Sequence, residues 1–135
     1  MRSICISIVA MLALAGTTLA ATITVPGDYA TIQGAIDAAV DGDEILVGPG
    51  IYTGDGDQIV NTMGKDIWLH SSHGPQLTII DGQEIRRCIL INSGETANLV
   101  VEGFTVQNGY ADSGAGLFCS WSSVTVRDCV FQNNT

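Results

Sequence analysis

Beyond residue 20, apolar side chains follow helical spacing in one segment near the start of the chain. The residues that recur at i, i+3, i+4, i+7 and i+8 are Ile32, Ala35, Ile36, Ala39 and Val40. This spacing places them on one face of a helix. Asp28 or Thr31 can cap its start, and Gly42 stands just beyond its end. The pattern predicts a helix over residues 29–40, which must pack on another element because a helix this short is marginal alone.

The rest of the chain alternates between apolar and polar positions in short runs. Val, Ile, Thr and aromatic residues dominate the runs, and Gly, Asn, Asp and Ser fill the gaps. The predicted strands are EILV at 44–47, IWLH at 67–70, LTII at 77–80, CILI at 88–91, LVVE at 99–102, FTV at 104–106, GLFC at 116–119, VTVR at 124–127 and CVFQ at 129–132. The pattern shows no helix between them, which argues against a doubly wound α/β sheet and leaves a sandwich or a coiled solenoid.

Two stretches share the same alternation of inward-facing and outward-facing positions. NLVVEGFTVQNG at 98–109 and SVTVRDCVFQNN at 123–134 align position by position without a gap. The alignment extends backwards, with Ile67 in the place of Leu99 and Ile45 in the place of Ile67. A repeat length that varies while the strand pattern is kept indicates a solenoid with loops of different lengths. The alternative is a sandwich with accidental similarity, since only three of the twelve positions in the two stretches are identical.

The first twenty residues have the layout of a secretory signal peptide. A basic residue precedes an apolar run at 4–16, and Thr18 and Ala20 supply small residues at positions −3 and −1 of a cleavage site. The run is short for a membrane anchor, which needs roughly 20 apolar residues. We therefore predict a leader of residues 1–20 and one domain of residues 21–135. The protein is expected to be secreted or on the cell surface, and not integral to the membrane after cleavage.

The charge of the chain limits the classes of partner it can bind, and its cysteine content limits the disulfides it can form. Without the leader the chain carries four basic and fourteen acidic residues, a net charge of −10. We expect no nucleic-acid partner, because phosphates are bound by clustered Lys and Arg. A basic substrate or a divalent cation would suit the charge, although solubility alone also explains surplus acid. Cys88, Cys119 and Cys129 allow at most one disulfide and lack zinc spacing, so they are expected to fill the interior as thiols.

Several short motifs resemble those of one family. The matching segments are TIQ at 31–33, AIDAA at 35–39, PGIY at 49–52, IDG at 80–82, GAGLFC at 114–119 and VRDCVF at 126–131. The first three resemble the start of pectin methylesterases. Together they resemble the pectin-lyase-like superfamily of secreted, right-handed, single-stranded parallel β-helices, over nearly all of residues 22–134. The resemblance implies an all-β solenoid of about four coils, with residues 29–40 as a cap over its apolar first coil.

The resemblance is specific for fold and not for function, because one fold hosts many activities. Members of the superfamily include polysaccharide lyases, pectin esterases, epimerases and adhesins. The esterases use a pair of Asp with an Arg and a Gln, and the pectate lyases use an Arg with calcium-binding acids. Neither set can be matched here position by position, so no catalytic residue is expected.

The aligned coils predict one outward column of side chains. If Leu69 and its equivalents point inward, alternation turns His70, Glu102 and Arg127 outward, with the carboxylate between two potential cations. The resemblance implies that a ligand groove follows such a face, so these three residues and Trp68 are candidates to face a carbohydrate. Trp121 is a second candidate to stack on sugar rings. The alternative is ordinary sheet pairing of opposite charges, worth about 0.2–1 kcal/mol per pair.

The remaining polar motifs are expected to be structural. DGD at 41–43 and at 55–57 lacks EF-hand spacing and the six to eight oxygens that calcium needs, so both are predicted to be acidic turns. No metal site and no cofactor are predicted. Calcium stays open as an alternative cofactor that no specific motif supports. Asn108 and Asn133 fall at equivalent turns and are expected to form a stacked ladder.

These observations favour a secreted or cell-surface β-helix protein that binds extracellular polysaccharide, or presents a surface to it. We expect no catalysis by this chain. The alternative is the N-terminal part of a polysaccharide lyase or pectin esterase whose catalytic coils lie beyond residue 135. The sequence stops one residue after SVTVRDCVFQNN, without a recognisable C-terminal cap, and we interpret it as part of a longer protein.

Overall fold

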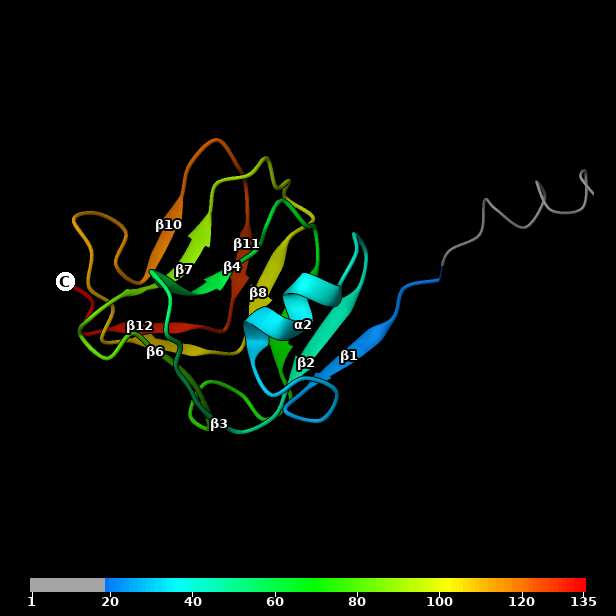
Figure 1. The fold of residues 1–135 in the computed structure, drawn as a ribbon, viewed down its shortest axis with the longest axis horizontal. Coiled ribbons are helices and arrows are strands. Elements are labelled where there is room, and N and C mark those ends of the chain that lie inside the picture. Colours follow the sequence, from blue (N-terminus) through cyan, green and yellow to red (C-terminus); the bar gives the residue numbers. More distant parts are fainter. Residues whose placement is uncertain (1–18) are drawn as a thin grey trace, which may run out of the picture.

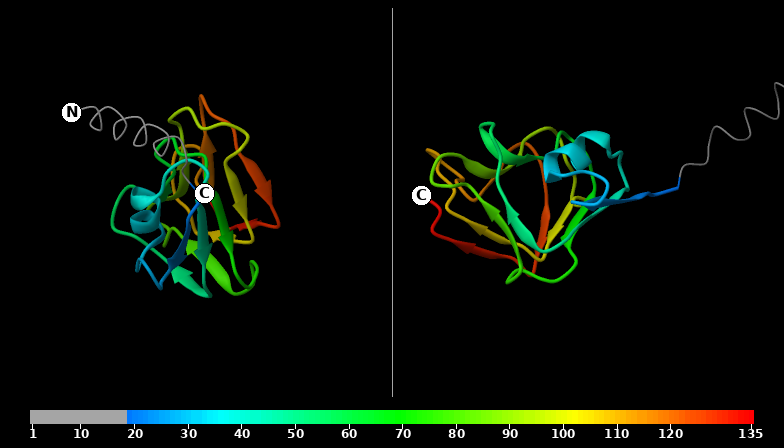
Figure 2. Two further views of the ribbon diagram at one scale, coloured as in Figure 1. Left: turned by 90° about the vertical axis from the view of Figure 1, so that its right-hand side faces the viewer. Right: turned by 60° about the horizontal axis from the view of Figure 1, so that its bottom comes forward.

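The computed structural model describes residues 19–135, which wind into a parallel β-solenoid (Figures 1 and 2). Three stacks of strands form its sides. Sheet A contains β1 (Thr22–Val25), β2 (Glu44–Val47), β5 (Trp68–Ser71), β8 (Val100–Glu102) and β11 (Thr125–Arg127). Sheet B contains β3 (Gly50–Tyr52), β6 (Thr78–Asp81), β9 (Thr105–Gln107) and β12 (Val130–Gln132). Sheet C contains β4 (Gln58–Asn61), β7 (Arg87–Ile91) and β10 (Leu117–Cys119).

The chain visits sheets A, B and C in turn, and each strand pairs in parallel with its equivalents in the adjacent coils. This confirms an all-β solenoid of about four coils and excludes the sandwich. The right-handed winding implied by the resemblance stays a prediction.

The core is a stack of inward side chains from successive coils. Ile45, Leu69 and Val101 are adjacent in sheet A and fully buried. Val126 pairs with Val101 in the same column, yet it is 40% exposed because β11 is the outermost strand of sheet A. Stacked apolar columns provide most of the hydrophobic stabilisation of a solenoid, since each coil contacts only its neighbours.

Strand pairing confirms two of the predicted registers and corrects the third. Leu69 lies opposite Val101, and Val101 lies opposite Val126, as the alignment predicts. Ile45 lies opposite Leu69, so the predicted pairing of Ile45 with Ile67 is wrong. A shift of two residues along a strand keeps every side chain on the same face of the sheet. The hydrophobic pattern therefore cannot distinguish the two registers.

Three strands were not predicted from the sequence. β1, β3 and β4 are short, and β3 begins at Gly50 directly after a Gly-Pro turn. The nine predicted strands are all present, with bounds that differ by a residue or match.

The predicted cap helix is present as α2 (Ile32–Ala38), shorter than residues 29–40. Of the two candidate caps, Thr31 is the N-cap, and its hydroxyl accepts a hydrogen bond from the Gly34 amide at 3.0 Å. The helix contacts β1, β2 and β4, and its Ile36 side chain is fully buried in the core. Figure 1 shows α2 beside β1 and β2, the first strands of sheet A. The helix therefore covers the apolar end of the solenoid.

Two polar side chains attach the helix to the solenoid. The Gln33 amide accepts from Asn61 N at 2.7 Å and donates to Asn61 O at 3.0 Å, so it replaces a neighbouring strand at the outer edge of β4. Lys65 Nζ donates to Ile36 O at 2.7 Å and to Asp37 O at 3.1 Å. The lysine thereby satisfies the Asp37 carbonyl in the last turn of the helix and adds a second donor to the Ile36 carbonyl, which also accepts from Ala39 N.

Replacing Gln33 with alanine is expected to lower the free energy of unfolding by about 1–2 kcal/mol, because two backbone groups at a strand edge lose their partner. Urea unfolding at neutral pH measures the change. Gln58→Ala is the matched control, since no residue of 19–135 hydrogen-bonds the Gln58 side chain. Equal losses for the two variants would show that Gln33 does not protect the edge of β4.

The two turn asparagines share one backbone conformation, but the ladder between coils is formed by other side chains. Asn108 and Asn133 both adopt a left-handed conformation, with φ of 55° and 56°. Asn108 donates to Asp81 at 3.2 Å, and the ladder between coils is formed by Gln132 donating to Gln107 at 2.8 Å. Burial raises the pKa of Asp81, but hydrogen bonds from Gln107, Gln83 and Asn108 outweigh it and leave this pKa lowered. The Asp81 carboxylate is thus the ionised end of a structural ladder.

The three cysteines of residues 19–135 are free thiols in different environments. Cys88 is fully buried, and burial raises its pKa to about 11. Cys129 is half-buried, and burial also raises its pKa. Cys119 is exposed, so the prediction that it fills the interior is wrong. It lies on β10, the last strand of sheet C, with no further coil to cover it.

Candidate functional site

The outer face of sheet A brings the four predicted carbohydrate-facing residues together. His70 is opposite Glu102 in the strand register, and Glu102 is opposite Arg127. Arg127 Nη2 lies 3.4 Å from Glu102 Oε1. Trp68 Nε1 donates to the same oxygen at 3.0 Å. The predicted column therefore exists as a contiguous polar surface.

Trp68 is held rigidly within this surface. Its ring stacks on the His70 imidazole with centroids 3.7 Å apart and planes 6° from parallel. This stacking and the hydrogen bond from Nε1 to Glu102 together fix the orientation of the indole. The side chain nevertheless remains 40% exposed. A large aromatic surface is thus presented to solvent in one orientation, which reduces the entropy lost when a ligand binds.

Glu44 belongs to the same surface and was missed from the sequence. Its Oε1 lies 2.7 Å from His70 Nε2, and its Oε2 accepts from the Thr22 hydroxyl at 3.1 Å. The predicted register places Glu44 beside Asp66, whereas the true register places it beside Trp68. The imidazole of His70 therefore lies between two carboxylates, Glu44 and Glu102, instead of at the end of the column.

A groove follows this surface at the corner between sheets A and B. Its volume is about 540 Å³, and its walls include His70, Glu102 and Asp128 together with the loop residues Gly74 and Pro75. The loop between β5 and β6 forms one side because it is longer than the two-residue turn between β8 and β9 or between β11 and β12. Glu102 Oε2 and the Asp128 carboxylate accept no hydrogen bond from residues 19–135, which leaves both able to accept from a ligand.

Trp121 lies away from this groove. It is 93% exposed in the loop between β10 and β11, at the corner where sheet C leads to sheet A. The next residue, Ser122, bonds to Glu95 and not to the column. Trp68 and Trp121 are therefore two separate aromatic surfaces.

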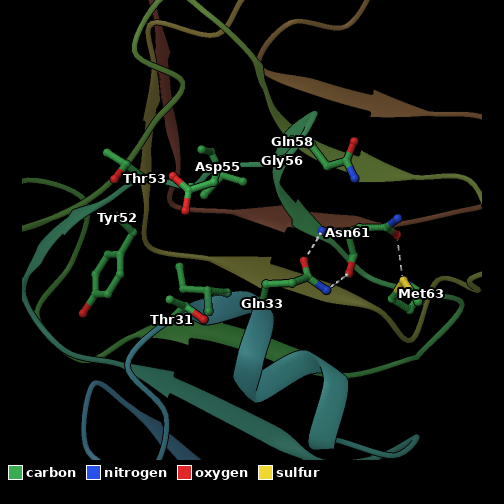
Figure 3. Close-up of a pocket in the computed structure, with 12 residues that line it drawn as sticks. Thr31, Gln33, Tyr52, Thr53, Asp55, Gly56, Gln58, Asn61 and Met63 are labelled. Atoms are coloured by element: carbon green, nitrogen blue, oxygen red, sulfur yellow. Dashed lines mark hydrogen bonds between the residues drawn. The ribbon is translucent and has the colours of Figure 1, made fainter.

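A second hollow lies between the start of α2 and the segment that joins β3 to β4 (Figure 3). Its volume is about 420 Å³. Figure 3 shows Gln33 and Asn61 hydrogen-bonded on one side and Tyr52 on the other. The Tyr52 hydroxyl donates to Gly48 O at 2.7 Å, so these groups are already occupied in holding the cap and the turn. We interpret this hollow as a by-product of the helix covering the edge of β4.

The acidic turn at 41–43 holds neighbouring segments of backbone. Asp41 Oδ1 accepts from Asp66 N at 2.8 Å, and Asp43 accepts from Ala21 N and Val40 N at 2.9 Å each. Within residues 19–135, no group of three or more His, Cys, Asp or Glu side chains is arranged to hold a metal ion. The same residues contain no helix of the length and apolarity needed to cross a membrane. The predicted leader at 1–20 lies almost wholly outside the described residues.

Comparisons of the chain with protein-family models, with curated proteins and with solved structures found no match. The fold is therefore established by the strand pairing itself. Functional interpretation depends on the side chains of the sheet A face.

Proposed function

We propose that the outer face of sheet A binds a saccharide chain, with Trp68 as the platform for one sugar ring. The observation that carries the proposal is the fixed and partly exposed Trp68 indole beside a groove lined by Glu102 and Asp128. Sugar rings present an apolar C–H face and a rim of hydroxyl groups. An aromatic ring with adjacent carboxylate acceptors complements both.

The charge of the outer face of sheet A, which includes the groove, favours neutral sugars over uronates. Glu44, Glu102 and Asp128 contribute carboxylates, whereas Arg127 already pairs with Glu102 and His70 already contacts Glu44. A polyanion would bring further carboxylates to this face of a chain whose net charge is −9. Neutral sugar hydroxyls can instead donate to the unpaired oxygens of Glu102 and Asp128.

We also propose that the protein belongs to the pectin-lyase-like superfamily, winds in the right-handed sense and is exported. The motifs at 31–39 and 49–52 and the leader pattern at 1–20 support these proposals. Binding without catalysis is proposed for this chain, because the superfamily's paired Asp and Arg have no counterpart in its motifs. Release of methanol or unsaturated uronates from pectin by the purified protein would favour the lyase or esterase alternative.

Trp68→Ala is expected to weaken binding to a neutral polysaccharide at least tenfold, a loss of about 1.4 kcal/mol, because it removes the platform. Affinity electrophoresis against a panel of neutral polysaccharides and polygalacturonate measures the change. Trp121→Ala is the matched control, since it removes an equally large aromatic side chain that lies away from the outer face of sheet A. Absence of binding to every polysaccharide, or equal weakening by the two variants, would contradict the proposal.

A further inference from the structure

Asp43 carries a buried carboxylate without a cationic partner. The residue is only 4% exposed. Its two oxygens accept from backbone amides alone, Oδ1 from Ala21 N and Oδ2 from Val40 N, each at 2.9 Å. No Lys, Arg or His among residues 19–135 pairs with it. Buried carboxylates are normally paired with a cation, because burial of a lone charge is costly in free energy.

The amide nitrogen that faces Asp43 belongs to the predicted cleavage bond. Ala21 is the first residue after the predicted leader, and its nitrogen is the nitrogen of the Ala20–Ala21 peptide bond. Leu19 is 94% exposed and Ala20 is also exposed, so this bond lies outside the packed fold. Ala21 O accepts from Glu44 N at 2.8 Å, which fixes Ala21 beside Asp43 independently of its own nitrogen.

We propose that removal of the leader supplies the missing cation, so that the α-ammonium group of Ala21 forms an ion pair with Asp43 and locks the first coil. An endopeptidase breaks the C–N bond between Ala20 and Ala21 with one water molecule. The hydroxyl goes to the Ala20 carbonyl carbon and a hydrogen to the Ala21 nitrogen, and the amine takes up a proton from solvent at neutral pH. The nitrogen changes from a neutral amide to a charged donor at an unchanged position.

The ion pair would join three segments at the capped end of the solenoid. Ala21 precedes β1, Asp43 precedes β2, and Val40 follows α2. A charge-assisted hydrogen bond is shorter and roughly twice as strong as a neutral one. Processing would thereby strengthen the attachment of both β1 and the cap helix. This inference rests on the predicted leader and is independent of saccharide binding.

The test expresses the whole 135-residue precursor in an exporting host and reads the N-terminus of the product by mass spectrometry. We expect it to begin at Ala21, and any other N-terminus would overturn the proposal. The product is then acetylated in urea at about pH 6.5, where the α-amine reacts and Lys65, the single lysine, stays protonated. After refolding, urea unfolding is measured with and without the acetyl group.

Acetylation is expected to lower the folding equilibrium constant about tenfold in the natural product and hardly at all in the product of Asp43→Asn. Asp41→Asn is the matched control, because Asp41 lies in the same turn and accepts from Asp66 N. Its product should respond to acetylation as the natural one does. Equal responses with and without the Asp43 carboxylate, or no response in the natural product, would overturn the ion pair. If D43N prevents export, the natural and D41N products decide, and an unchanged folding constant in them refutes the proposal.

Discussion

Glu95→Ala is expected to lower the free energy of unfolding by about 3–5 kcal/mol, because it removes a buried charged acceptor from a satisfied network. Glu95 is 3% exposed, and its carboxylate joins the loops of three coils. The four donors are the hydroxyl groups of Thr62 and Ser122 and the amides of Gly64, at 3.0 Å, and Ser93, at 2.8 Å. Without the carboxylate all four would need new partners in a site that solvent barely reaches.

The same network makes the stability depend on acid pH. Burial raises the pKa of Glu95, but the hydrogen bonds from Thr62, Ser93 and Ser122 outweigh it and lower this pKa from 4.5 to about 2. A carboxyl group whose folded pKa is depressed contributes stability above its unfolded pKa. The contribution is lost as the pH falls from 4.5 toward 2. We expect the natural chain to lose stability over this window.

Glu95→Gln separates the charge from the shape of the side chain. The variant should be destabilised at pH 7 and should show a flatter decline between about pH 4.5 and pH 2, since it has no carboxyl group to protonate. Urea unfolding at several pH values measures both effects. Glu84→Gln is the control, because Glu84 is exposed and the substitution is chemically identical. A pH profile of E95Q that matches the natural one would show that Glu95 does not govern the acid response.

The coiling of this protein could be predicted from sequence because alternation and repetition report on the same geometry. Every inward position in NLVVEGFTVQNG has an apolar equivalent in SVTVRDCVFQNN, and strand pairing confirms this alignment. The cap helix could also be predicted, because its helical spacing differs from the surrounding alternation of the strands. The length of the helix was not predicted correctly. The helix begins only after Thr31, and the backbone of Ala39 is already extended.

The site could be predicted only in part, because register and burial depend on contacts between coils. A two-residue slip preserves the faces of a strand, and for this reason Glu44 was not recognised as a neighbour of His70. Glu95 lies in a loop sequence, Ser-Gly-Glu-Thr, that is typical of an exposed turn. Its burial follows from donors on the preceding and following coils, at Thr62 and Ser122, which no local pattern reveals.

Gly82→Ala is expected to lower the free energy of unfolding by about 3 kcal/mol or more, because an added methyl group has no space between two coils. A Cβ atom at Gly82 would overlap Arg86 O and would lie 2.6 Å from Asn108 O and 2.7 Å from Gly109 Cα. All three are backbone atoms, so no side chain can rotate away. Two of them belong to the next coil, whose Gln107 O accepts from Gly82 N at 2.9 Å.

A matched pair of controls separates this clash from other effects of replacing glycine. Gly56→Ala meets only Gln58 O at 3.7 Å and should be neutral or slightly stabilising, because it mainly restricts the unfolded chain. Gly94→Ala has open space but a φ of +88°, so it isolates left-handed strain, expected to cost about 1 kcal/mol. Urea unfolding should show that G82A has a far lower free energy of unfolding than G94A, and that G94A has a lower one than G56A. If G82A were no less stable than G94A, the coils would not be in backbone contact at this corner, and the stacking there would be looser than the strand pairing of β6 with β9 implies.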